Sequence, residues 1–213
     1  MPGIPDLAEI YGEAFFREWG SPNEKYTASA RVIAGTLFKE FQPKRIVDIG
    51  SGSGVYSKLF RDLGVEVVSI DGVVPPPDLS FPGPVEIRDL RVPFENVWGA
   101  FDLTLCLEVA EHIPEASVDV FLDNLGKFGD LLIFSHAPER QGGIGHVNEQ
   151  PKRYWIAKLA AHGFAYDRPR TGVLMETWKV DKPAFMWMAE HICVFRRRRG
   201  PPTSGKPDGS GPP

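Results

Sequence analysis

The sequence predicts an α/β protein with a Rossmann-like, mostly parallel seven-stranded sheet and helices on both faces. Two observations support this prediction. Apolar runs with strand character alternate with segments of helical periodicity through most of the chain. In addition, the first strand leads into Asp48-Ile49-Gly50-Ser51-Gly52-Ser53-Gly54, an acidic residue and three alternating glycines followed by a helical segment. Such a turn lets a bulky ligand approach the backbone beside a helix N-terminus.

The expected elements follow one another in an order that the hydrophobic pattern sets. Helices are expected over residues 24–41, 54–63, 114–126 and 151–162. Strands are expected over residues 45–49, 66–70, 84–88, 102–107, 130–135 and 164–168, with a last strand near 190–196. Two proline clusters, Pro75-Pro76-Pro77 and Pro82-Gly83-Pro84, interrupt the segment where a second crossover helix would lie, so we expect that helix to be short or absent.

Length and composition fit one domain with a full hydrophobic core. The chain has 213 residues, of which 42% are hydrophobic. We expect a single domain over residues 1–199, in which residues 1–42 form an N-terminal helical cap. Nine of the fourteen residues in 200–213 are Gly or Pro, and this composition predicts a disordered tail.

Charge is unevenly distributed along the chain and argues against extended nucleic-acid binding. Residues 196–213 hold five basic side chains and one acidic, whereas residues 1–195 hold 19 basic and 27 acidic. A phosphate backbone needs many basic contacts, so we expect the Arg196–Arg199 cluster to be a solvated end of the last strand. Cys106 and Cys193 lie in apolar runs and are expected to be buried thiols. No signal peptide or membrane span is recognisable, which predicts a cytoplasmic location.

The spacing of the three glycines excludes two common nucleotide sites. A dinucleotide site needs G-x-G-x-x-G, but the sixth position is Val55 counted from Gly50 and Ser57 counted from Gly52. A phosphate-binding P-loop ends in Gly-Lys-Ser/Thr, whereas Lys58 follows a serine and precedes a leucine. The remaining pattern, Asp-x-Gly-x-Gly-x-Gly, resembles motif I of the class I S-adenosylmethionine-dependent methyltransferases, in which a carboxylate suits a cationic ligand.

Three later strand ends strengthen this resemblance, because they follow in the family's order. Val67-Val68-Ser69-Ile70-Asp71-Gly72 ends in a carboxylate about 20 residues beyond the glycine turn, where ribose hydroxyls are held. Val85-Glu86-Ile87-Arg88-Asp89-Leu90 ends the third strand with an acid at the position that often holds the adenine amino group in this family. Glu108-Val109-Ala110-Glu111-His112 is similar to the family's fourth motif.

The resemblance implies S-adenosylmethionine as the cofactor and the last two strands, around segment 169–189, as an antiparallel hairpin. Asp48 and the glycine turn would hold the amino-acid part of the cofactor, Asp71 its ribose and Asp89 its adenine. The residues expected to bind it are Asp48, Gly50, Ser51, Gly52, Gly54, Asp71, Gly72, Asp89, Leu90 and Glu108.

Three of the five histidines lie at or just after strand ends on the expected ligand side. These catalytic candidates are His112, His136 and His146. An imidazole can take the proton of an acceptor hydroxyl near neutral pH, and methyl transfer from a sulfonium otherwise requires mainly positioning. His162 and His191 are expected to be structural.

A metal-dependent and a metal-free mechanism both stay open. Glu108, Glu111 and His112 stand at i, i+3 and i+4, so a helical turn would bring them to one face, where they could hold Mg²⁺ or Mn²⁺. This spacing is similar to that of metal-dependent methyltransferases acting on vicinal hydroxyls, which take a further ligand from a later segment. His146 matches that ligand best, and His136 is second. In the metal-free alternative, Glu108 shapes the cofactor pocket, and His112 or His146 takes the proton directly.

Two further segments are expected near the acceptor. The loop 135–150 is rich in glycine and long for a strand–helix connection, which fits either a lid or a mobile surface connection. Phe15, Phe16 and Trp19 have helical spacing. That spacing predicts a helix packed on the core, and an aromatic substrate wall is compatible with it.

The function expected from these residues is O-methylation of a small polar acceptor, a sugar or a polyhydroxylated natural product. Three alternatives stay open: an RNA 3′-terminal 2′-O-methyltransferase, an N-methyltransferase of a small molecule, and a non-catalytic cofactor-binding scaffold. The acidic body disfavours the RNA alternative. The sequence does not indicate the oligomeric state.

Overall fold

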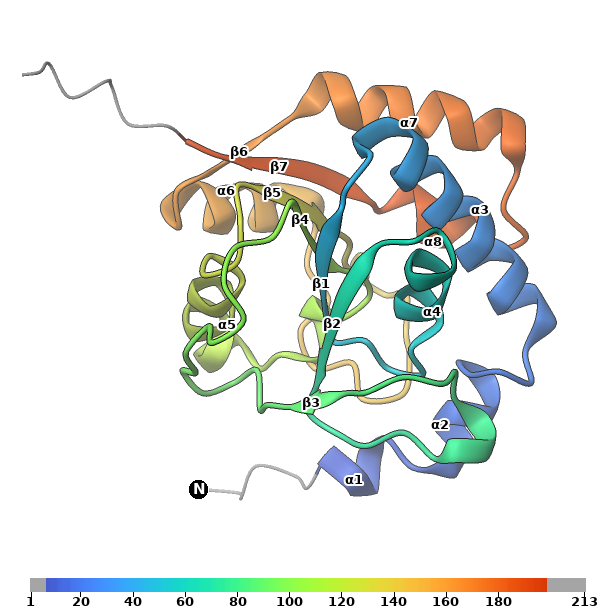
Figure 1. Cartoon of the computed structure of the whole chain (residues 1–213). Coiled ribbons are helices and arrows are strands. Elements are labelled where there is room, and N and C mark those ends of the chain that lie inside the picture. The colour runs from blue at the N-terminus through green and yellow to red at the C-terminus, as the bar shows by residue number, and fades with distance from the viewer. Residues whose placement is uncertain (1–6, 199–213) are drawn as a thin grey trace, which may run out of the picture.

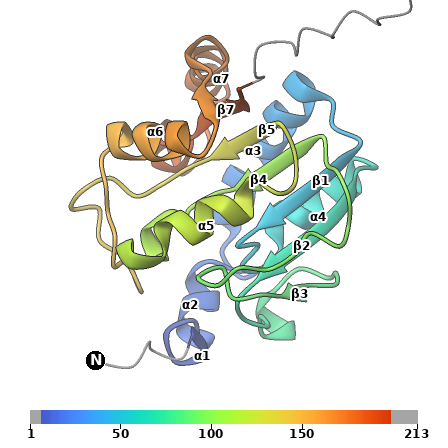
Figure 2. The ribbon, with the colours of Figure 1, turned by 90° about the vertical axis from the view of Figure 1, so that its left-hand side faces the viewer.

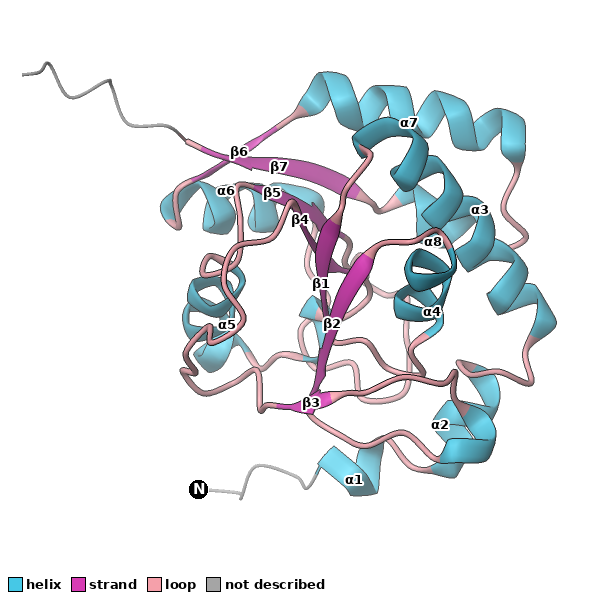
Figure 3. Cartoon of the chain, in the orientation of Figure 1, coloured by secondary structure: helices cyan, strands magenta, loops and turns pink. Residues whose placement is uncertain are grey.

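The computed structural model describes residues 7–198, which form a seven-stranded sheet with helices on both faces (Figures 1 and 3). The strands are β1 Arg45–Ile49, β2 Glu66–Asp71, β3 Glu86–Ile87, β4 Leu103–Cys106, β5 Leu131–Phe134, β6 Phe164–Tyr166 and β7 Cys193–Arg197. Their order across the sheet is β3-β2-β1-β4-β5-β7-β6. Strands β1 to β5 pair in parallel, and β7 is antiparallel to both β5 and β6. This confirms the Rossmann-like, mostly parallel sheet that the sequence predicts.

Helices cover the sheet in two layers. They are α1 Leu7–Ile10, α2 Glu13–Glu18, α3 Glu24–Phe41, α4 Val55–Asp62, α5 Val118–Leu125, α6 Lys152–Ala161, α7 Arg168–Asp181 and α8 Met186–Glu190. Figure 2 shows α5 and α6 on the side of the sheet that faces the viewer, with α3 and α4 behind it.

Two apolar cores, one on each face, hold these layers together. Side chains alternate across a strand, so the neighbours Ile46 and Val47 in β1 enter different cores. Val47 joins the core that contains Phe121 of α5 and Trp155 of α6. Ile46 joins the core of α3, α4, α7 and α8, which includes the buried Trp178.

Several expected elements are confirmed residue for residue, and one segment differs. The predicted helix 24–41 is α3, and the predicted strand 45–49 is β1. The last two strands pair antiparallel as expected, and α7 and α8, for which no element was predicted, lie between them. Asp167 caps α7 by accepting a hydrogen bond from the Arg170 N–H, and a proline stands in the first turn.

Prolines reduce the crossover between β2 and β3 as predicted. In place of a helix, that segment has one 3₁₀ turn, Pro77–Leu79. The expected tail 200–213 lies outside the described residues, so its disorder and the domain bounds stay predictions. Within residues 7–198 there is no helix long and apolar enough to cross a membrane; the cytoplasmic location stays a prediction.

The ends of β1, β2 and β4 define the edge of the sheet that matters for function. These strands are parallel neighbours, so the segments that follow them leave the sheet at the same edge. From β1 the strand order runs to β2 on one side and to β4 on the other, which makes the end of β1 a topological switch point. Ligands of open α/β sheets bind at such points.

Candidate active site

The turn after β1 alternates glycine and serine, and its glycines expose backbone beside a cavity. Gly50, Gly52 and Gly54 have φ angles of 71°, 52° and 78°, a region that side chains rarely adopt. Gly50 is also sterically required, because a Cβ there would lie 2.3 Å from Cγ2 of Val109. Gly54 is the N-cap of α4, so the N-terminus of that helix begins at the turn. A ligand in the cavity can therefore approach backbone amides closely.

Asp48 lies buried at the end of a chain of polar side chains. Ser57 Oγ donates to Asp48 Oδ2 at 2.6 Å, Ser57 and Ser69 share a hydrogen bond of 2.7 Å, and Arg61 donates to Ser69 Oγ at 2.8 Å. Burial raises the pKa of Asp48 to about 6, and the hydrogen bond from Ser57 partly offsets this rise. A cationic ligand beside this carboxyl would favour its ionised form.

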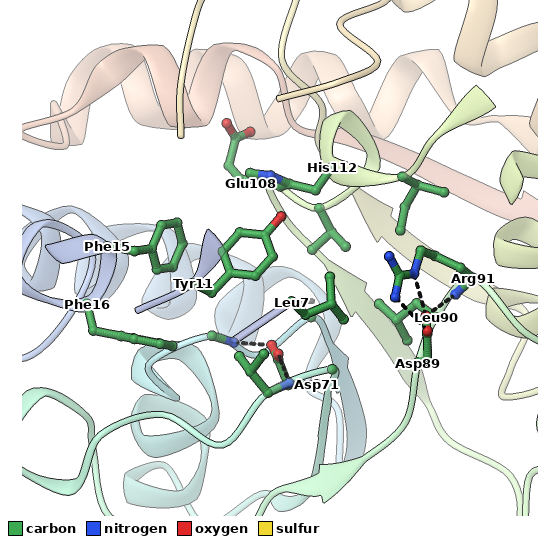
Figure 4. A pocket seen from close by; sticks show the side chains of 16 residues that line it. Leu7, Tyr11, Phe15, Phe16, Asp71, Asp89, Leu90, Arg91, Glu108 and His112 are labelled. Atoms are coloured by element: carbon green, nitrogen blue, oxygen red, sulfur yellow. Dashed lines mark hydrogen bonds and ion pairs between the residues drawn. The ribbon is translucent and has the colours of Figure 1, made fainter. Parts of the chain in front are cut away.

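Asp71 connects the end of β2 to the glycine turn (Figure 4). Its Oδ2 accepts a hydrogen bond from the Gly52 N–H at 2.7 Å, and its Oδ1 accepts one from the Val73 N–H at 3.0 Å. Burial raises its pKa, and the backbone amides oppose the rise. At the adjacent Gly72 a Cβ would lie 2.7 Å from Cδ1 of Leu7, so α1 packs directly against the expected ribose-binding position.

Asp89, the expected adenine ligand, is engaged by Arg91. Arg91 Nε and Nη2 donate to its two carboxyl oxygens at 2.9 and 2.8 Å, as Figure 4 shows. The hydrogen bond from the Arg91 side chain lowers the pKa of Asp89. The ion pair with Arg91 therefore fixes the orientation of the Asp89 carboxylate to which an adenine amino group would donate.

Two adjoining cavities open at this edge of the sheet. The first cavity is lined by Leu7, Tyr11, Asp71, Asp89, Leu90 and Arg91. The second cavity is lined by Trp19, Tyr26, Asp48, Trp187, Met188 and residues of the loop 135–150. Both are also lined by Phe15, Gly50, Gly52, Glu108 and His112. All four acidic residues that the sequence predicts as cofactor contacts, Asp48, Asp71, Asp89 and Glu108, thus line at least one of the two cavities.

Aromatic side chains of the N-terminal segment line both cavities. Phe16 is buried, as its helical spacing predicts, and also lines the first cavity; Phe15 lines both cavities and Trp19 the second. The ring of Tyr11 packs edge to face against Phe15 and His112, with centroids 5.1 and 5.4 Å apart. Burial raises the pKa of Tyr11 to about 12. The segment around α2 therefore packs on the core through Phe16 and supplies aromatic side chains to the walls of the cavities.

Two glutamates lie at the end of β4. Glu108 has a φ of 55°; its N–H donates to Ser135 Oγ at 2.8 Å, and Ser135 Oγ–H donates to Glu108 Oε1 at 2.6 Å. Glu111 is buried, and neither of its carboxyl oxygens has a hydrogen-bond partner among the described residues. Burial, followed by the Glu108 charge, raises the pKa of Glu111 well above its usual value. Burial raises that of Glu108 to about 7.

Three of the four expected metal ligands come together beside these carboxyls. Glu111, His112 and His146 each offer a ligand atom within 4.8 Å of the others. We call this set the Glu–His–His cluster. The two imidazoles lie at 4.9 Å between centroids, and His112 Nδ1 is buried without a partner among the described residues. Burial, followed by the proximity of His146, lowers the pKa of His112 to about 4. Glu108, the fourth expected ligand, adjoins the cluster without belonging to it.

The loop 135–150 is docked over the site. The N–H groups of Val147 and Asn148 both donate to the carbonyl of Glu111 at 2.9 Å. A Cβ on Gly145 would lie 2.8 Å from Cγ2 of Ile10, so the loop also touches α1. The loop therefore carries His146 to the second cavity. His146 Nδ1 donates to Glu149 at 2.8 Å, and this hydrogen bond lowers the pKa of Glu149.

His136, the third catalytic candidate, lies apart from both cavities. Its ring is buried at the end of β5, with centroids 6.4 Å from Trp155 and 5.8 Å from His191. Burial lowers its pKa to about 4. The structure thus places His136 next to Trp155 of α6, outside the lining of both cavities and outside the Glu–His–His cluster.

The site residues that sequence reasoning missed include Tyr11, Arg91, Glu149 and Trp187. Arg91 stands two residues beyond an expected ligand, and Glu149 three beyond His146, but neither proximity is a signal by itself. Trp187 lies in the segment 169–189, for which no element was expected.

Comparison with known proteins gives the family. The model of the family described as a methyltransferase domain matches residues 23–199. The chain belongs to this family of class I methyltransferases, which confirms the predicted class and S-adenosylmethionine as its cofactor.

Two ubiquinone biosynthesis O-methyltransferases are similar in sequence. The one from Colwellia psychrerythraea is 31% identical over 130 residues, 57% of this chain and 49% of that protein. The one from Pseudomonas aeruginosa is 29% identical over 60% of this chain and 54% of that protein. The matches span only about half the length of these relatives.

Among solved structures, a Burkholderia thailandensis 1,6-didemethyltoxoflavin-N1-methyltransferase with bound S-adenosylhomocysteine covers 93% of both chains, with a TM-score of 0.60 and 16% identity. A sugar N-methyltransferase from Streptoalloteichus covers 88% of this chain and 92% of its own, with a TM-score of 0.57 and 12% identity. At these identities the likeness concerns the fold.

Proposed function

We propose that this protein transfers the methyl group of S-adenosylmethionine to a hydroxyl oxygen of a small, ring-bearing acceptor in the second cavity. One observation carries the proposal: the Glu–His–His cluster lines the second cavity, and its His112 also lines the first. Groups that accept a proton or hold an acceptor oxygen thus stand where donor and acceptor would meet. The names of the ubiquinone biosynthesis relatives favour oxygen as the methylated atom.

The residues of the cluster suit proton removal from a hydroxyl. In the proposed reaction the acceptor oxygen attacks the methyl carbon, the carbon–sulfur bond breaks in line with it, and S-adenosylhomocysteine leaves. The hydroxyl proton goes to a base. His146 is our first candidate, since its Nδ1 donates to Glu149 and its Nε2 is left to accept. His112 is the second, because its Nδ1 has no partner in the described part of the chain.

The cluster also fits a divalent cation. Among the described residues, the carboxyl oxygens of Glu111 and the Nδ1 of His112 are buried without hydrogen-bond partners, a situation that a bound ion would resolve. Of the two expected ions, Mn²⁺ suits one carboxylate and two imidazoles better than Mg²⁺, which favours oxygen ligands. A bound cation would hold and acidify the acceptor hydroxyl.

The walls of the second cavity favour a ring in the acceptor. Trp19 stands edge to face with Tyr26 and Trp187, at centroid distances of 5.7 and 5.9 Å. Aromatic walls of this kind bind sugar rings and planar ring systems through their faces. We therefore retain the expected acceptor class, a sugar or polyhydroxylated natural product.

The RNA alternative gains no observation in its favour. Arg196 donates to Asp167 at 3.0 Å, and Arg197 pairs with Asp130 at 3.4 Å and lies over the ring of Phe164. These arginines are engaged within the molecule, whereas RNA binding would need them free for phosphates.

The test uses a panel of sugars, vicinal diols, their monomethyl ethers and matched amines with S-adenosylmethionine, followed by mass spectrometry that locates the added methyl group. We expect methylation of hydroxyl oxygen in the diols and sugars. Products methylated only at nitrogen or carbon would overturn the oxygen assignment.

The cation is tested separately by chelation. We expect EDTA to abolish turnover and Mn²⁺ to restore it, while calorimetry shows unchanged binding of S-adenosylhomocysteine. Turnover that is indifferent to EDTA would leave the histidines as the bases and remove the cation from the mechanism.

A further inference from the structure

The carboxylate of Glu149 accepts hydrogen bonds from three residues of the loop that carries His146. Its Oε1 accepts hydrogen bonds from the Gly142 N–H at 2.6 Å and from His146 Nδ1 at 2.8 Å, and its Oε2 accepts one from the Arg140 N–H at 2.8 Å. A single carboxylate thus receives three donors from residues three to nine positions before it. Its side chain is 19% exposed, and of the three contacts the one with His146 is part-buried.

The loop backbone bends to make these contacts. Arg140 has a φ of 69°, and Gly142 one of 72°, a conformation that costs a residue with a side chain about 1–2 kcal/mol. Arg140 adopts it although it is not glycine, and its N–H thereby reaches Glu149. The contacts with Glu149 therefore hold a conformation that the Arg140 side chain disfavours.

Gly143 packs against the face of the His146 ring. A Cβ on Gly143 would lie 2.4 Å from His146 Nε2 and 2.6 Å from its Cε1. The imidazole is therefore confined by the Glu149 carboxylate at Nδ1 and by the bare backbone of Gly143 against its ring face, which leaves the in-plane direction of Nε2 unobstructed by either. The side chain of His146 is only 12% exposed.

We propose that Glu149 is a positioning residue that fixes the tautomer and orientation of His146. A carboxylate only accepts, so the proton of a neutral His146 stands on Nδ1, and the lone pair of Nε2 is available for a proton or a cation in the second cavity. A carboxylate behind a metal-binding or basic histidine acts in this way in many sites. The inference rests on the proposed function, which gives His146 its task.

The tautomer can be measured without turnover. In protein labelled with ¹⁵N histidine and free of cofactor and metal, long-range ¹H–¹⁵N spectra distinguish a proton on Nδ1 from one on Nε2. We expect His146 to carry it on Nδ1 in the unchanged protein, and Glu149→Ala to move it toward Nε2, the tautomer that a free imidazole favours. Glu139→Ala is the matched control, because Glu139 is an exposed glutamate of the same loop.

Two functional readouts accompany the spectra. We expect Glu149→Ala to lower kcat, and to weaken Mn²⁺ binding measured by electron paramagnetic resonance, by about 10–100-fold, with the affinity for S-adenosylhomocysteine unchanged. Glu149→Gln keeps the size of the side chain and serves if the alanine variant folds poorly; its loss of charge should give an intermediate effect. Gly143→Ala should reproduce the kcat defect by displacing the ring while Glu149 remains.

An Nδ1 proton that persists in both Glu149 variants would overturn the proposal, as would a proton on Nε2 in the unchanged protein. Failure of the proposed function gives a different pattern. In that case the spectra still respond to Glu149, but His146→Ala leaves turnover unaltered.

Discussion

In the first cavity, polar groups come mainly from the ends of neighbouring parallel strands, whereas the second cavity combines Asp48 and the glycine turn after β1 with the turn after β4, the loop 135–150 and α8. Backbone contributes strongly to the first: Gly52 donates to Asp71, and Gly50 leaves room for Val109. Side chains dominate the second, where His146, Trp187 and Glu111 arrive from segments far apart in the chain. The edge of the sheet is common to many enzymes with this fold, so a site built there can bind a methyl donor that these enzymes share. Loops vary more in sequence, so a site built from them can differ between enzymes that methylate different acceptors.

The strongest test of separate donor and acceptor cavities is to remove the side chain of His146. We expect His146→Ala to lower kcat by about 10²–10⁴-fold, the usual loss for a general base. Because His146 lines only the second cavity, calorimetry should show unchanged affinity for S-adenosylhomocysteine. A parallel loss of donor affinity would show that the two cavities are not separate in function.

The converse variant is Gly50→Ala in the first cavity. The added Cβ meets Val109 in a left-handed backbone conformation, so strain and overpacking of about 1–3 kcal/mol should shift the turn and lower donor affinity by about 10–100-fold. Gly64→Ala is the matched control, because Gly64 has a φ of 81° but no atom near its Cβ position. Equal donor affinity in the two variants would contradict the steric argument.

Asp48 should give donor binding a pH dependence that acceptor contacts do not share. Its pKa of about 6 in the unliganded protein means that the anion, which attracts the cationic donor, disappears as the pH falls below 6. Affinity for S-adenosylmethionine should drop about tenfold per pH unit there. Asp48→Asn should bind more weakly at pH 7.5 and lose this slope; calorimetry from pH 5 to 8 measures both.

The same carboxyl should affect stability with the opposite sign. Its folded-state pKa lies above the ordinary 3.8, so the stability it contributes is present at low pH and is lost as the pH rises from 3.8 to about 6. Unliganded Asp48→Asn should therefore be more stable than the unchanged protein at pH 7.5, by about 1–3 kcal/mol. Urea unfolding should show this difference vanish near pH 4; a difference independent of pH would contradict the linkage.

The smallest expected effect concerns the aromatic wall. Trp187→Ala removes a ring that packs against Trp19 and Phe185, and we expect the acceptor KM to rise about tenfold, in line with a lost aromatic contact of about 1.5 kcal/mol. Donor affinity should not change. A lower kcat at unchanged KM would instead place Trp187 in the ordering of the loop.

Much of the first cavity could be predicted because its determinants are local. Gly50, Gly52 and Gly54 reveal a left-handed turn through their spacing alone, and Asp71 and Asp89 are recognisable as acids that end apolar strands. The Asp89–Arg91 pair was not predictable, since two residues of separation do not determine whether the side chains fold back on each other.

The positions of the three histidine side chains could not be predicted from the local sequence. His112, His136 and His146 all follow strand ends, yet two join the Glu–His–His cluster and the third is buried beside Trp155. Strand ends place a residue at an edge of the sheet, but the packing of α6 and the docking of the loop decide which way the side chain points.

From its sequence alone this protein was determined to be a class I methyltransferase domain, because glycine spacing, strand alternation and the acids at strand ends are properties of short segments. The tertiary structure alone decided that Leu7 and Tyr11 cover the first cavity, that α7 and α8 fill segment 169–189, and that Glu149 holds His146. The physical reason is that such contacts join segments whose meeting depends on the packing of the whole fold.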